Sequence, residues 1–168
     1  RALEPYDVIW MEDILQPTSV PALRRLVSET RVPQCVSERL ITKAAYLEVL
    51  QSQAAHLAMI DLVWTGGLTE SLKIASLADA HHLPFAPHDC TGPVNLFAAL
   101  HLCAAQPNAR IMEVVRGFCQ GSYRELVDQP VPLAQGRALL DFGPGLGVKL
   151  RPEVFERKDA TVRVSEKN

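Results

Sequence analysis

The sequence predicts an α/β protein that forms part of a parallel (β/α)8-type barrel, with about five β-α units in residues 1–115. Short apolar segments alternate five times with helical patterns, and this alternation is typical of a parallel sheet. The segments are apolar throughout, as strands buried on both faces are. The side chains suited to chemistry come at the carboxyl ends of these segments, where barrel active sites are built.

An open, doubly wound sheet is the alternative architecture. Its nucleotide-binding form carries a GxGxxG or P-loop sequence after a strand. Neither pattern follows any predicted strand here. We therefore favour the barrel.

The predicted strands are short apolar runs that end in polar or turn residues. They are VIWME (8–12), VPQCVSE (32–38), LAMIDLV (57–63), LPFAP (83–87) and ARIMEVV (109–115). A first helix opens at Pro17 with Thr18 or Ser19 as its N-cap, and Thr42 caps a second. A third helix covers residues 69–82 and a fourth about 93–105.

Three of the predicted helices have an apolar face at helical spacing. The inward-facing residues are Val20, Leu23, Leu26 and Val27 in the first helix, Ala45, Leu47 and Leu50 in the second, and Leu72, Ile74, Leu77 and Ala78 in the third. These faces are expected to pack against the sheet.

The pattern changes after Val115, so we divide the chain into a partial barrel, 1–115, and a tail, 116–168. The tail is rich in Gly and Pro, with a short helical stretch at 122–127 and a turn cluster at 143–147. We expect it to pack against another part of the molecule, and residues 166–168 to be disordered. Because the chain starts at Arg1 and enters an apolar run almost at once, we expect a fragment.

Composition excludes several classes of protein. The chain has 168 residues, 48% hydrophobic and 21% charged, as ordinary soluble globular proteins have. Its net charge of -2 and the lack of a basic run argue against nucleic-acid and membrane partners. Four cysteines without a CxxC pair indicate free thiols in a reducing compartment, so we expect a cytoplasmic protein.

Two glutamates are candidate metal ligands. Glu12 and Glu38 close consecutive strands of the predicted parallel sheet, so their carboxylates would project into the same mouth. Mg²⁺ prefers oxygen ligands and often keeps waters, so two or three carboxylates suffice. The alternative is that each caps a helix or pairs with an arginine, such as Arg39 beside Glu38. The acidic and histidine residues at the next strand ends favour the metal site.

Asp61 and His88 follow the third and fourth strands and are the candidate catalytic pair. Adjacent parallel strands would make them neighbours. A carboxylate bonded to one ring nitrogen fixes the tautomer and raises the basicity of the imidazole, leaving the other nitrogen to take a proton. Asp89 is an alternative partner, although adjacent residues rarely orient each other well.

Two further features stay open at this point. Gly66-Gly67 could present backbone N–H groups to an anion at a helix start, or could be a tight turn that needs positive φ. Glu113, at the end of the fifth strand, could hydrogen-bond a developing oxyanion if protonated, or could be a structural acid.

Together these segments resemble the enolase superfamily, and within it the mandelate racemase-like branch, which includes acid-sugar dehydratases. The matching segments are IWMED, VSERL, IDLVWTGGLTES, PFAPHDCTGP, IMEVV and, near the end, FGPGLGVKL. The resemblance covers nearly the whole chain, which would be the second half of the family's protein. The family fold is a modified barrel with a capping domain, on which the tail would pack.

The resemblance implies roles for the candidate residues. Glu12 and Glu38 would be the second and third ligands of Mg²⁺, with the first ligand and any second base before Arg1. His88 would be the general base, oriented by Asp61, and Glu113 would contact the enolate. The reaction would begin with removal of the proton α to a carboxylate, with the enediolate stabilised by the metal.

We therefore expect a Mg²⁺-dependent hydro-lyase that dehydrates a sugar acid, an aldonate or aldarate. Its partners would be that small carboxylate and further copies of itself as a homo-oligomer. One alternative is a racemase or epimerase of 2-hydroxy acids, although Trp64 stands near where some members carry a lysine base. The other is a non-catalytic, truncated half-barrel that associates through exposed edges.

Overall fold

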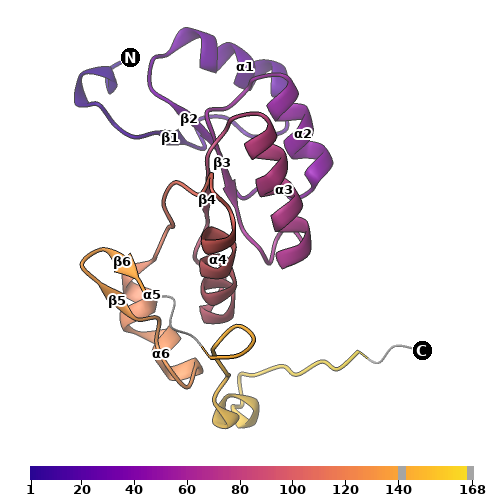
Figure 1. Cartoon of the computed structure of the whole chain (residues 1–168), viewed down its shortest axis with the longest axis vertical. Helices are drawn as coiled ribbons and strands as arrows, with labels where there is room; N and C mark the ends of the chain where they lie inside the picture. The colour runs from indigo at the N-terminus through magenta and orange to yellow at the C-terminus, as the bar shows by residue number, and fades with distance from the viewer. Residues whose placement is uncertain (140–142, 166–168) are drawn as a thin grey trace.

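The computed structural model describes residues 1–139 and 143–165, so the expected disorder of residues 166–168 lies outside its description. Four strands form one parallel sheet in the order β1-β2-β3-β4 (Figure 1). They are β1 (Met11–Glu12), β2 (Gln34–Val36), β3 (Leu57–Ile60) and β4 (Phe85–Pro87). The predicted α/β class with a parallel sheet is confirmed.

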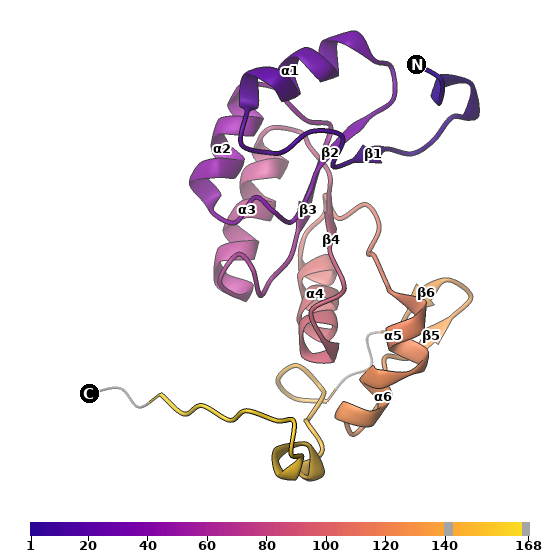
Figure 2. The same cartoon turned by 180° about the vertical axis from the view of Figure 1, so that it is seen from behind.

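One helix follows each strand. These are α1 (Val20–Glu29), α2 (Lys43–Gln51), α3 (Leu68–Ala80) and α4 (Pro93–Ala105). Figure 1 and Figure 2 show α1, α2 and α3 side by side along one face of the sheet. Thr42 caps α2 as predicted, because its side chain accepts the Ala45 N–H at 3.2 Å.

Both faces of the sheet are buried, which explains the continuous apolar strands. Side chains alternate along β3, so Ala58 and Ile60 join the helix-facing core while Leu57 and Met59 join a smaller cluster on the other face. Trp10 packs against that smaller cluster. The sheet is therefore a layer with packing on two sides.

The prediction of a fifth strand over residues 109–115 is wrong. Ala109 makes only an isolated parallel bridge to Phe85. Phe85 donates to the Asn108 carbonyl at 3.0 Å and accepts from Arg110 at 2.9 Å. The next residue of β4 that could pair with the segment, Pro87, has no N–H to donate. Its carbonyl accepts one hydrogen bond, from the Glu113 N–H at 3.2 Å. The segment follows β4 without becoming a strand.

The buried faces of two helices also differ from the prediction. In α2, Leu50 is buried as predicted, but Tyr46 and Val49 are buried in place of the half-buried Ala45 and Leu47. The Tyr46 hydroxyl donates to the Met59 carbonyl, so this tyrosine can reach the sheet. In α3, Leu72 is 40% exposed.

The inward face of α3 contains small residues instead. Ser71, Ile74, Ala75 and Ala78 are buried. The Ser71 hydroxyl bonds Thr65 Oγ1 at 2.7 Å and donates to the Gly67 carbonyl at 3.0 Å. A serine with both contacts can be buried at little cost, which lets α3 approach the sheet closely.

The tail contains more structure than the single helical stretch predicted. It forms α5 (Arg116–Gln120), α6 (Ser122–Leu126), a hairpin of β5 (Leu133–Ala134) and β6 (Arg137–Ala138), and a 3-10 helix at Pro152–Glu156; another 3-10 helix covers Glu4–Tyr6. Cys119 and Tyr123 pack against Leu96 of α4. Within the described residues, every helix is too short or too polar to cross a membrane.

Candidate active site

The candidate residues lie at the carboxyl ends of the four strands. Because parallel strands end at one edge of a sheet, residues distant in sequence gather there. Glu12 ends β1, Glu38 comes two residues after β2, Asp61 directly follows β3, His88 directly follows β4, and Glu113 lies in the segment beside β4.

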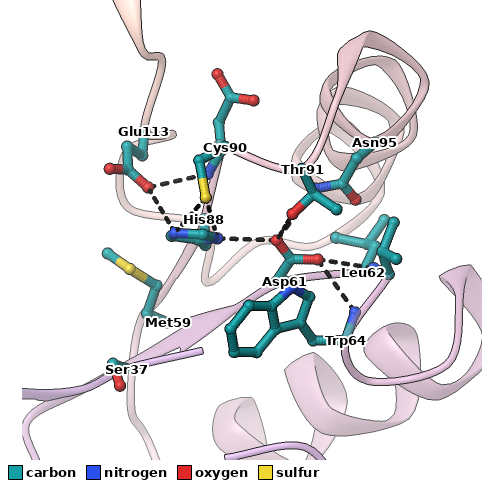
Figure 3. Close-up of polar contacts among 12 residues, drawn as sticks. Ser37, Met59, Asp61, Leu62, Trp64, His88, Cys90, Thr91, Asn95 and Glu113 are labelled. Carbon is teal, nitrogen blue, oxygen red and sulfur yellow. Dashed lines mark hydrogen bonds and ion pairs between the residues drawn. The ribbon is translucent and has the colours of Figure 1, made fainter. Parts of the chain in front are cut away.

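Asp61 and His88 are in contact. The Nδ1 atom of His88 lies 2.8 Å from Oδ2 of Asp61, and the Asp61 side chain is fully buried (Figure 3). The backbone N–H of His88 donates to the Ile60 carbonyl at 3.0 Å, which places the histidine beside the end of β3. The parallel pairing of β3 with β4 therefore creates the pair.

The remaining hydrogen bonds to Asp61 engage both of its carboxylate oxygens. Its Oδ1 accepts the N–H groups of Val63 at 2.8 Å and Trp64 at 3.2 Å. Its Oδ2 accepts the Thr91 hydroxyl at 2.5 Å and the Asn95 amide at 3.4 Å. A buried carboxylate with this many donors is well satisfied.

The pKa of His88 is raised above its ordinary value of 6.5. Burial alone would lower this pKa, since it disfavours the charged ring. The hydrogen bond to Asp61 and the negative charges of Glu38, Glu113 and Asp61 outweigh burial. The imidazole is therefore a stronger base than a free histidine.

The other ring nitrogen of His88, Nε2, lies beside Glu113 and Cys90. It lies 3.9 Å from Oε2 of Glu113 and 3.4 Å from Sγ of Cys90. The Trp64 ring meets the imidazole edge-on with 6.4 Å between centroids. In Figure 3, Glu113 lies on the side of the ring away from Asp61, and the Cys90 sulfur lies over the ring, within 4.0 Å of Nδ1 as well.

Asp89 is a structural residue and does not orient His88. It is fully buried, and it accepts the Val115 N–H and the Tyr123 hydroxyl, each at 3.0 Å. Burial raises its pKa, although those two hydrogen bonds oppose the shift. Asp89 thus joins the end of β4 to the tail, and its backbone N–H holds Glu113 Oε2 at 2.9 Å.

Glu12 and Glu38 are close enough to interact electrostatically. Burial raises the pKa of Glu12, the Trp10 indole N–H at 3.4 Å from Oε2 opposes the shift, and the negative charge of Glu38 adds to it. The Arg39 side chain contacts Asp13 at 3.6 Å and Gln16 at 2.9 Å. In the described ranges, no group of three His, Cys, Asp or Glu residues is arranged to hold a metal.

The Gly66-Gly67 pair forms a turn. Both glycines have positive φ, 100° and 107°. Their N–H groups donate to the carbonyls of Val63 at 3.3 Å and Leu62 at 2.6 Å, which closes the turn before α3. Since both N–H groups are engaged, the structure supports the turn interpretation over the anion site.

Sequence reasoning missed Cys90, Thr91 and Asn95, which all contact the Asp61–His88 pair. They lie in the loop after β4 and in the first turn of α4. The run Thr91-Gly92-Pro93 is typical of a helix start, and nothing in it indicates a contact with Asp61. Finding the donors to Asp61 requires knowing that the start of α4 lies next to the end of β3, and the sequence does not show this.

The chain matches the family described as enolase C-terminal domain-like over residues 1–154. It is 31% identical over 154 residues to a D-xylonate dehydratase from Haloferax volcanii, covering 92% of this chain and 37% of that protein. It is 34% identical over 128 residues to a D-galactonate dehydratase from Ralstonia nicotianae, covering 76% and 34%. The chain thus spans well under half the length of these relatives.

The chain is also similar to solved structures of enolase-type proteins. An enolase protein from Sargasso Sea environmental sequencing superimposes with a TM-score of 0.90 and 43% identity, covering 99% of this chain and 45% of that one. An enolase of the mandelate racemase subgroup from Agrobacterium tumefaciens gives 0.84 and 41%, covering 92% and 42%. The similarity extends over nearly all of this chain.

Proposed function

The chain belongs to the enolase C-terminal domain-like family, and from that premise we propose that it carries the catalytic base of a Mg²⁺-dependent sugar-acid dehydratase. The contact between Asp61 and His88 is the observation that carries the proposal. The names of the curated relatives, D-xylonate and D-galactonate dehydratase, support a hydro-lyase acting on an aldonate or aldarate.

We also propose that the four-stranded sheet is an arc of a (β/α)8-type barrel. Three features support this: the strands are parallel, both faces of the sheet are buried, and the candidate residues share the carboxyl edge. The tail, residues 116–168, would contact a capping region. This domain division stays a prediction.

His88 would remove the proton α to the substrate carboxylate. Because Asp61 engages Nδ1, the proton would be taken by Nε2, the nitrogen that Asp61 leaves available. The electrons of the broken C–H bond would first move onto the carboxylate, giving an enediolate, and would then form a C–C double bond as the β-hydroxyl departs. His88 would return its proton to that hydroxyl to release water. The enol product then becomes a 2-keto-3-deoxy acid.

Glu113 would hydrogen-bond the oxygen on which negative charge develops. Its Oε2 already accepts the Asp89 N–H, so Oε1 would have to carry the proton that it donates. In this role Glu113 would act as a neutral acid with substrate bound and stabilise the transition state at the developing oxyanion, whereas in the free chain its negative charge helps to raise the pKa of His88. The 3.9 Å separation from His88 Nε2 supports the placement of both groups against one substrate.

The Glu12 and Glu38 pair fits Mg²⁺. Both are hard oxygen donors. Burial is the main cause of the raised Glu12 pKa, the negative charge of Glu38 adds to it, and a bound cation would relieve that repulsion. Mg²⁺ is often held by one or two carboxylates, with waters and substrate completing its octahedron. When bound, it would supply positive charge that offsets the substrate carboxylate and makes its α-proton more acidic.

A panel of aldonates and aldarates tests the reaction class. With Mg²⁺ present, at least one acid should yield a 2-keto-3-deoxy product, measured as its semicarbazone by absorbance. The Asp61→Asn variant should lose that activity, because the ring would no longer be held by a carboxylate. Exchange of the α-proton without any keto product would instead favour the racemase.

A further inference from the structure

A side-chain hydroxyl beside the candidate pair has no part in the proposed reaction. Asp61 is fully buried, and the Thr91 hydroxyl bonds its Oδ2 at 2.5 Å. The same oxygen lies 2.8 Å from Nδ1 of His88. Figure 3 shows both side chains meeting at that single atom.

The direction of these two bonds follows from the chemistry of the acceptor. An ionised carboxylate has no proton to give, so both Thr91 and His88 donate to it. The imidazole therefore carries a proton on Nδ1, and in its neutral form Nε2 holds the lone pair. The orientation of Oδ2 decides which ring nitrogen keeps the proton.

Thr91 controls that orientation more than the other donors to Oδ2. The Asn95 amide is 3.4 Å from the oxygen, a long contact beside the 2.5 Å hydroxyl bond. The backbone donors of Val63 and Trp64 hold Oδ1 instead. Losing the hydroxyl would leave Oδ2 with one strong donor, the imidazole itself.

We propose that Thr91 is a positioning residue whose hydroxyl fixes Oδ2 of Asp61 against Nδ1 of His88, so that Nε2 stays free to accept a proton. The catalytic use of that nitrogen rests on the proposed function. The effect on the tautomer is a property of the chain itself and can be measured without a substrate.

Other groups that face the imidazole stay the same in a Thr91 variant. They are the carboxylates of Glu38, Glu113 and Asp61 and the thiol of Cys90. Thr91→Val removes the hydroxyl and keeps the branched shape, while Thr91→Ser keeps the hydroxyl and removes a methyl group. A difference between the two variants therefore reports the hydrogen bond.

The test is ¹⁵N NMR of the histidine ring nitrogens in the full chain across a pH series, with His88 assigned by its loss in His88→Gln. In the unsubstituted chain and in Thr91→Ser, neutral His88 should be the Nδ1–H tautomer, with its titration midpoint raised. In Thr91→Val, Nε2–H tautomer should appear and the midpoint should fall. Identical tautomers and midpoints in all three proteins would overturn the inference.

A second measurement covers the case in which Thr91→Val fails to fold. In the unsubstituted chain, the Thr91 hydroxyl proton should exchange slowly with water and show a cross-relaxation signal to the Nδ1 proton of His88. A hydroxyl that exchanges as fast as those of exposed threonines would overturn the inference. Both NMR measurements are independent of turnover. A chain that dehydrates no acid would therefore refute the proposed function, while the positioning role of Thr91 would still be decided by the NMR results.

Discussion

His88 is held so that one ring nitrogen is occupied and the other is available. The sequence predicted this pair because both members directly follow apolar strands, and neighbouring parallel strands bring their ends together. It could not predict Thr91, Cys90 or Asn95, since their contacts depend on where α4 begins relative to β3. The sequence therefore predicts which residues meet at the strand ends, but it does not predict the loop and helix residues that contact them.

The raised pKa of His88 predicts how stability depends on pH. The folded chain binds this proton more tightly than the unfolded chain, so the contribution is fully present below the unfolded pKa of about 6.5 and is lost as pH rises through the folded pKa. The difference in unfolding free energy between the chain and His88→Gln should stay constant at low pH and shrink as pH rises above about 6.5. Urea unfolding over a pH series measures it.

His56 provides a control of opposite sign. Burial lowers its pKa, so the unfolded chain holds that proton more tightly, and stability rises with pH. The difference between the chain and His56→Gln should therefore grow with pH. Equal pH slopes for the two variants would contradict this assignment.

The two glutamates predict weak, carboxylate-dependent binding of Mg²⁺. Glu12→Gln and Glu38→Gln should each weaken binding by about tenfold, equivalent to about 1.4 kcal/mol. Glu48→Gln, at an exposed position in α2, is the matched control and should change nothing. Calorimetric titration with MgCl₂ measures all three; an unchanged affinity in both site variants would place the metal elsewhere.

At the scale of elements, sequence signals located helices better than strands. The predicted range of α4, about 93–105, is confirmed by its bounds Pro93–Ala105. Gly92 and Pro93 at its start and Pro107 after its end are residues that typically flank a helix. The strands are shorter than their apolar runs. The run 8–12 begins three residues before β1, and the run 57–63 continues three residues beyond β3 into the loop that carries Asp61. The buried faces of α2 and α3 were partly misread, because Tyr46 and Ser71 are buried through hydrogen bonds that periodicity does not show.

The turn between β3 and α3 should depend on glycine. Gly67 has φ of 107° and ψ of −179°, a conformation that L side chains rarely adopt. Gly67→Ala should lower the unfolding free energy by about 1–3 kcal/mol. Gly117→Ala, in α5 with open space around its Cβ, should change stability by about 0.5 kcal/mol or less. Equal effects of the two substitutions in urea unfolding would show that the turn is not strained by a side chain.

For the whole molecule, the sequence predicted the parallel α/β class but gave one strand too many. The fifth segment is apolar like the others, and its failure to pair comes from Pro87 in the neighbouring strand. A two-residue β1 lies at one edge of the sheet, with Ile9 beside it 64% exposed. An open edge with apolar neighbours favours association.

The chain should therefore self-associate through the β1 edge. Sedimentation velocity should show species larger than the 18.5 kDa monomer that increase with concentration. Ile9→Glu should reduce that fraction, because a charge at the edge opposes pairing. Val164→Glu, in the exposed tail, is the control and should leave it unchanged. A monomer at every concentration would contradict the prediction.

Exchange of substrate α-protons for deuterium tests the central claim most directly, because it reports the first step that His88 would perform. The chain with Mg²⁺ in D₂O should incorporate deuterium at the α-carbon of a reactive sugar acid, as followed by proton NMR. His88→Asn should abolish this exchange, while His82→Asn, at an exposed position after α3, should leave it intact. Exchange that persists at the same rate in His88→Asn would show that another group removes the proton and would contradict the account.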